Sequence, residues 1–91
     1  MPVDEQLLAR ARENPASVMF DEACSLAQHL GWEKKRINGS HHVFHHPLSQ
    51  KIRKRYPQPL NLQEGKSGAA KSYQVRQMLD MAIAMGIIEK E

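Results

Sequence analysis

The sequence predicts an α+β domain: a two-layer sandwich in which a three-stranded antiparallel sheet carries helices on one face and leaves the other face open. Two segments with helical apolar spacing come first, three short strand-like segments follow, and a long amphipathic segment comes last. At 91 residues, 41% of them apolar, the chain has the size and composition of one domain over residues 1–91. We divide it into an N-terminal helical extension, residues 1–16, and a core, residues 17–91.

Three segments carry the pattern of helices. Residues 4–13 have acidic side chains in the first turn and stop before a proline. Residues 19–31 repeat apolar side chains at helical spacing, and Cys24 is expected to be a small buried hydrophobe among them. The segment ends at Gly31, because a glycine readily adopts the left-handed conformation that ends a helix. Residues 72–88 are the clearest helix, and the serine at their start is the expected N-cap. The apolar positions of this last helix are Val75, Met78, Leu79, Ala82 and Ile83.

Three short segments between these helices are expected to be strands. Residues 32–38 ("WEKKRIN") and 41–46 ("HHVFHH") flank a Gly-Ser turn and therefore predict an antiparallel hairpin. Residues 60–63 ("LNLQ") are a short third strand. The polar segment 48–59 directly follows one proline and ends at another, so it is expected to be a loop.

Strand alternation gives the second strand a direction, because successive side chains point to opposite faces of a sheet. Phe44 is the only large aromatic residue of the segment, so we expect it to face the helices. His42 and His46 then share its side. The side chains expected on the open face are His41, Val43 and His45.

The middle of the chain is strongly basic. Residues 32–76 hold ten lysines and arginines against two acidic residues, whereas the segments on either side are net acidic. Such a charge distribution favours an anionic partner, most commonly nucleic acid, over a solvated basic surface without a ligand. The single cysteine excludes an internal disulfide and a cysteine-built zinc site. No apolar run is long enough to span a membrane and no signal-peptide pattern begins the chain, so we expect a cytoplasmic protein.

Four of the five histidines lie in "GSHHVFHHP", residues 39–47, and three interpretations compete. In the first, His41 and His45 share a metal ion, but no acidic residue or cysteine is close in sequence and the nearby cations would repel the ion. In the second, a histidine transfers protons near neutral pH while cations hold a phosphate, which is a minimal arrangement for RNA cleavage. In the third, the histidines of a polar strand have no function. The residue types disfavour the metal site and leave the other two interpretations open.

The combination "GWEKKRINGSHHVFHHP", "LNLQ" and "GKSGAAKSYQVRQML", in this order between Phe20 and Ile87, resembles the HicA toxin family of bacterial toxin–antitoxin systems. The resemblance implies a fold like that of double-stranded-RNA-binding domains, in the order helix, three strands, helix. It also implies an mRNA interferase that needs no metal or other cofactor and is neutralised by a HicB-like antitoxin.

The resemblance points to His41 as the catalytic residue, because the family's functional histidine directly follows Gly-Ser. Two departures from the family pattern stand out: a serine replaces the proline that is common before the tyrosine of the last helix, and the loop 48–58 is unusually long and basic. The residues expected to bind RNA are Lys34, Lys35, Arg36, Gly39, Ser40, His45 and Lys71.

Our leading hypothesis is therefore an endoribonuclease in which His41 acts as general base or acid, while cations in segments 34–36 and 51–55 hold the RNA backbone. His45, His42 or water would be the proton donor. The alternative is an RNA-binding module without chemistry, and a third hypothesis is metal storage or sensing. The N-terminal helix lies outside the basic pattern and is a candidate for dimerisation or antitoxin docking.

Overall fold

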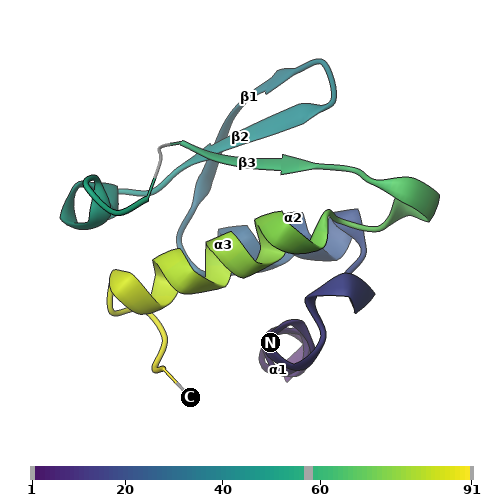
Figure 1. Ribbon diagram of the computed structural model, residues 1–91, viewed down its shortest axis with the longest axis horizontal. Helices are drawn as coiled ribbons and strands as arrows, with labels where there is room; N and C mark the ends of the chain where they lie inside the picture. The colour runs from purple at the N-terminus through teal and green to yellow at the C-terminus, as the bar shows by residue number, and fades with distance from the viewer. Residues whose placement is uncertain (1, 57–58, 91) are drawn as a thin grey trace.

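The computed structural model describes residues 2–56 and 59–90 (Figure 1). Within these ranges the chain forms three α-helices, three β-strands and three short 3-10 turns. The helices are α1 (Pro2–Glu13), α2 (Phe20–His29) and α3 (Ser72–Ala84), the strands are β1 (Glu33–Asn38), β2 (His41–His45) and β3 (Leu60–Gln63), and the 3-10 turns are η1 (Pro15–Ser17), η2 (Ser49–Ile52) and η3 (Lys66–Gly68).

The strands form one antiparallel sheet in the order β1-β2-β3. The helices α2 and α3 lie against one of its faces, and α1 packs against these two helices on the same side (Figure 1). The predicted two-layer α+β fold is confirmed, and the order from α2 to α3 is the helix–three strands–helix order that the family resemblance implies. In the described part of the chain, no helix covers the opposite face of the sheet. That face is therefore available to a partner.

The core lies between the sheet and the helices. Its largest fully buried side chains are Trp32, Phe44, Leu26, Leu60, Leu62, Met78, Met81, Val18 and Val75. Leu7 and Ala11 of α1 belong to the same buried cluster, so the N-terminal helix packs into the core of the domain. On α3 the helical spacing correctly identified the buried residues Met78, Leu79 and Ala82. Gln74 is buried as well, although the apolar spacing did not include it, so the contact face of α3 is wider than the sequence pattern indicated.

Two local expectations were wrong. Segment 48–59 is not a plain loop, because its first part forms η2 and the side chain of Ile52, only 2% exposed, belongs to the core. The N–H groups of Arg55 and Tyr56 both donate to the Ile52 carbonyl, at 3.0 Å each, and close the next turn over it. At the start of α3, the N-cap is Lys71 and Ser72 is already the first helical residue.

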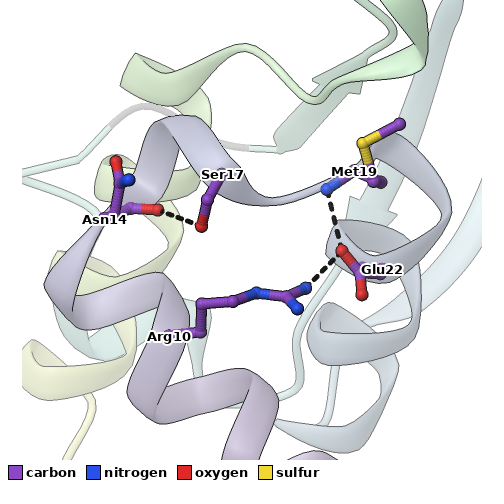
Figure 2. A network of polar contacts seen from close by, with 5 residues as sticks. All are labelled: Arg10, Asn14, Ser17, Met19 and Glu22. Atoms are coloured by element: carbon purple, nitrogen blue, oxygen red, sulfur yellow. Dashed lines mark hydrogen bonds and ion pairs between the residues drawn. The ribbon is translucent and has the colours of Figure 1, made fainter.

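The N-terminus of α2 is held by the carboxylate of Glu22 (Figure 2). Its Oε1 accepts a hydrogen bond of 3.0 Å from the backbone N–H of Met19, the N-cap, and forms an ion pair with Arg10 of α1. A glutamate in this position satisfies a helix N–H that has no partner inside the helix. One side chain thus caps α2 and ties it to α1.

The acid dependence of stability gives a test of this cap. The hydrogen bond from Arg10, and after it the one from Met19, lowers the pKa of Glu22. The stabilisation is therefore fully present above the ordinary pKa of a glutamate and is lost as the pH falls through the lowered value. We expect Glu22→Gln to reduce the free energy of unfolding by less than about 1 kcal/mol at pH 7, because solvent screens this exposed pair.

At a pH below the lowered pKa of Glu22, where the carboxylate is protonated, the two proteins should unfold at the same denaturant concentration. Urea titrations of both proteins at the two pH values measure the difference. A difference that is equally large at both pH values would contradict the role of the carboxylate.

Candidate functional site

Two of the three side chains expected on the open face, His41 and His45, lie where strand alternation predicted them. His41 and His45 are exposed, whereas Phe44 on the opposite face is fully buried in the core. Val43 was expected to be open to solvent, and this was wrong, since its side chain is only 3% exposed. It is not part of the core cluster beneath the sheet, so we infer that it is buried on the open face.

A β-bulge separates the three cations of β1. Lys34 lies opposite Phe44 and Arg36 lies opposite Val43, so Lys35 is the extra residue. Directly opposed residues share a face of the sheet, so Arg36 lies on the open face with His41. The Lys34 ammonium instead lies 5.7 Å from the centre of the Phe44 ring, on the helix side. The sequence treated these cations as one group, and the bulge shows that they are not.

An acidic neighbour partly neutralises Lys35, the second cation of β1. The Lys35 ammonium forms an ion pair of 3.0 Å with Glu33. Arg36 is exposed, and it is therefore the best-placed cation of β1 for an anion bound near His41.

His41 begins β2 directly after the turn, opposite Asn38 on β1 and Gln63 on β3. Gly39 provides the left-handed residue of this turn, with φ of +64°. The side-chain amide of Gln63 donates a hydrogen bond of 3.0 Å to Ser40 Oγ. The third strand therefore holds the turn that presents His41.

Gln74 on α3 supports this contact from below. Its Oε1 accepts a hydrogen bond of 2.8 Å from the backbone N–H of Gln63, and its side chain is only 5% exposed. A buried glutamine that satisfies a backbone N–H fixes the edge of the sheet. Sequence reasoning missed both glutamines, although a glutamine at an apolar position of α3 was a usable signal. Lys71, expected to bind RNA, lies just before this helix as its N-cap.

His46 has a structural role. Its Nδ1 accepts a hydrogen bond of 3.0 Å from the Leu48 N–H, so the ring proton is on Nε2, which donates to the Leu30 carbonyl at 2.9 Å. The ring packs edge-on against Trp32, with 4.9 Å between the ring centres. These contacts tie the end of β2 to the end of α2 and remove His46 from the candidates for chemistry.

Two further titratable side chains near the hairpin, His42 and Cys24, are partly buried. The ring of His42 lies edge-on to Phe20, with 4.7 Å between the ring centres. Burial raises the pKa of the Cys24 thiol, which keeps it protonated at neutral pH, in agreement with its role as a small hydrophobe. Across residues 2–56 and 59–90, no three His, Cys, Asp or Glu side chains are grouped so that they could hold a metal ion.

The second group of cations lies at the other end of the sheet from the β1–β2 turn (Figure 1). Lys51, Arg53, Lys54 and Arg55 are exposed in and just after η2. Along β2 the Cα atoms of His41 and His45 are already about 13 Å apart, because a strand rises about 3.3 Å per residue. The two basic segments therefore do not hold the same phosphate, and only an extended ligand could contact both.

The fold and this site define a class: a small two-layer α+β domain that presents a histidine and an arginine on an uncovered sheet face. Residues 20–61 match the family model described as the HicA toxin of bacterial toxin–antitoxin systems. The match runs from α2 into β3, which is less than half of the chain, and over this segment it confirms the resemblance to the HicA toxin family. The match supports a toxin of a toxin–antitoxin system, and the partner of such a toxin is an antitoxin.

The match includes His41, Arg36 and the turn between them, and it ends before Gln63. No curated protein and no solved structure gave a significant match to the chain. No helix in the described ranges is both long and apolar enough to cross a membrane.

Proposed function

We propose that the chain is the endoribonuclease toxin of a HicA/HicB-type system, with His41 as the catalytic residue. The observation that carries the proposal is the position of His41: exposed on the uncovered face, next to a tight turn, and on the same face as Arg36. Histidine is the side chain that exchanges protons near neutral pH without a metal. Residues 17–91 form the proposed RNA-cleaving core, and residues 1–16 are its helical extension.

The proposed reaction uses the ribose 2′-OH of the substrate as the nucleophile. His41 accepts the 2′-OH proton, the 2′ oxygen bonds to phosphorus, and the bond from phosphorus to the 5′ oxygen breaks. The products are a 2′,3′-cyclic phosphate and a 5′-OH, whose proton comes from water. Arg36 stabilises the charge that develops on the phosphate oxygens. Gln63, by bonding Ser40, positions the turn that aims His41.

The other proposed RNA-binding residues extend this site. His45 lies about four strand residues, or roughly 13 Å, from His41, which is too far for both to reach one phosphate. We therefore propose that it contacts the RNA chain and is not the proton donor. Lys34, Lys35 and Lys71 stay proposed phosphate contacts at the edges of the site, and Gly39 and Ser40 form the turn.

The test is RNA cleavage without metal ions. The purified protein should cleave mRNA in excess EDTA as fast as in Mg²⁺, and the products should end in cyclic phosphate. The assay is gel electrophoresis of labelled RNA with mass analysis of the ends. Binding that weakens steeply with salt, with no product in either buffer, would favour the alternative, an RNA-binding module without chemistry. Cleavage lost in EDTA and restored by Mg²⁺ would exclude the histidine mechanism.

The proposal also names the partner and the compartment. A HicB-like antitoxin would neutralise the toxin by covering the cationic face, and charge complementarity would favour an acidic protein. Cleavage of mRNA places the activity in the cytoplasm. The neighbouring reading frame in the genome should encode a small acidic protein, and co-expression with it should prevent RNA cleavage.

A further inference from the structure

Tyr73 is an aromatic side chain that lies outside the hydrophobic core. The chain has five aromatic residues, all in its described part: Phe20, Trp32 and Phe44 are buried, and Tyr56 is half-buried with Arg55 beside its ring. Tyr73, in the first turn of α3, is 61% exposed. A large ring held in solvent contributes little to the core, so its position calls for another explanation.

Hydrogen bonds connect this ring to the turn of His41. The Tyr73 hydroxyl accepts a hydrogen bond of 3.4 Å from the amide of Gln74. The oxygen of the same amide accepts the bond from the Gln63 N–H, and the Gln63 side chain donates to Ser40. Gln74 and Gln63 thus connect Tyr73 to the turn through hydrogen bonds at the β3 edge of the sheet. Gln74 bonds both the hydroxyl and the strand, so the ring is oriented relative to the site.

The surroundings of Tyr73 indicate the chemistry of its ligand. Lys71 precedes it, and no acidic residue lies in the first turn of α3. An exposed ring in the first turn of a helix that has a lysine at its N-cap suits a ligand that combines an anion with a flat apolar face. A nucleotide of single-stranded RNA has both, since its phosphate binds cations and its base stacks on aromatic rings. Protein interfaces are by contrast depleted of lysine.

We propose that Tyr73 stacks on a nucleobase of the RNA whose phosphate is cleaved at His41. The inference rests on the proposed function only for the position of that phosphate; the stacking itself needs no cleavage. The site would bind any unpaired base through its flat face and would form no hydrogen bonds with the base edge that distinguishes one base from another. The substrate class that follows is single-stranded RNA, with little dependence on which base occupies the position.

Binding measurements on the full chain test the proposal, with His41→Ala as the background so that the RNA stays intact. Tyr73→Ala should lower the affinity for a single-stranded RNA oligonucleotide by about 5- to 100-fold, while Tyr73→Phe keeps the affinity near that of the parent protein. An oligonucleotide of the same length and charge with abasic residues separates stacking from phosphate binding. Its affinity should be the same with and without the Tyr73 ring.

A fluorescent reporter gives a second measurement. Trp32 is the only tryptophan and is 2% exposed, so Tyr73→Trp adds an indole that responds separately to solvent. RNA should quench this indole, and the abasic oligonucleotide should not. Leu48→Ala is the matched control, because Leu48 is an exposed apolar side chain, 38% exposed, beyond the far end of β2. It should leave the RNA affinity unchanged.

Three results would overturn the stacking site. They are an unchanged affinity of Tyr73→Ala, an equal loss of affinity for the abasic oligonucleotide, and an indole that only the antitoxin protein quenches. The last result would assign the ring to a protein contact. If the parent protein fails to cleave RNA but Tyr73 still stacks, only the proposed function fails. If cleavage depends on His41 but not on Tyr73, only the present inference fails.

Discussion

Replacement of His41 by alanine should lower the rate of RNA cleavage by a factor of about 10² to 10⁴, the usual contribution of general acid–base catalysis. His41 is exposed, so the substitution removes no core contact and the fold should persist. Single-turnover cleavage of a labelled RNA at saturating protein measures the chemical step directly. Circular dichroism and RNA affinity should match those of the parent protein, because the cations that hold the phosphate remain.

Two further variants separate chemistry from position. His45→Ala, on the same strand and face, should weaken RNA binding by a few-fold and leave the single-turnover rate unchanged. Gln63→Leu removes the hydrogen bond to Ser40 Oγ, and it should lower the rate without changing the pH at which cleavage is half-maximal. If His41→Ala cleaves RNA and arrests growth as the parent does, the catalytic assignment is wrong.

Replacement of Gly31 by alanine should destabilise the protein by about 3 kcal/mol. Gly31 follows α2 with φ of +105°, and a Cβ there would lie 2.6 Å from Nε2 of His46. The imidazole cannot retreat easily, because the hydrogen bonds to Leu30 and Leu48 hold both of its nitrogens. For a domain of this size the loss corresponds to a fall in Tm on the order of 10–20 °C.

Gly86→Ala is the matched control for this prediction. Gly86 also has a positive φ, +80°, but a Cβ there would meet nothing within 4 Å. It should cost only about 1 kcal/mol from backbone strain. The double variant Gly31→Ala with His46→Ala should be more stable than the sum of the single effects predicts, because the clash disappears. Equal losses for the two glycine variants would contradict the steric role of His46.

Much of the fold could be read from the sequence because its signals are local. Helical spacing identified α2 and α3, and Gly31 and the Gly-Ser turn marked two chain reversals that the structure confirms. Alternation along β2 correctly separated the exposed His41 from the buried Phe44. These features depend on side-chain period and backbone preference, which each segment carries within itself.

The errors arose where distant segments determine the environment. Nothing local to "EKKR" reveals the bulge that places Lys34 beside Phe44 and Arg36 on the face of His41, because a bulge depends on the register with β2. Nor does the polar segment 48–59 reveal that Ile52 is buried, since the core cluster to which it belongs is formed by residues far along the chain.

The four histidines of the hairpin show the same division. The sequence by itself determined that they lie on one strand or directly after it, and that His41 follows a turn in a basic region. Only the tertiary structure decided their roles, because each role depends on neighbours far along the chain: Phe20 packs against His42, Leu30 and Trp32 hold His46, and Gln63 supports the turn of His41. A sequence carries the identity of a side chain, but the contacts that fix its proton and its exposure form only when the layers pack.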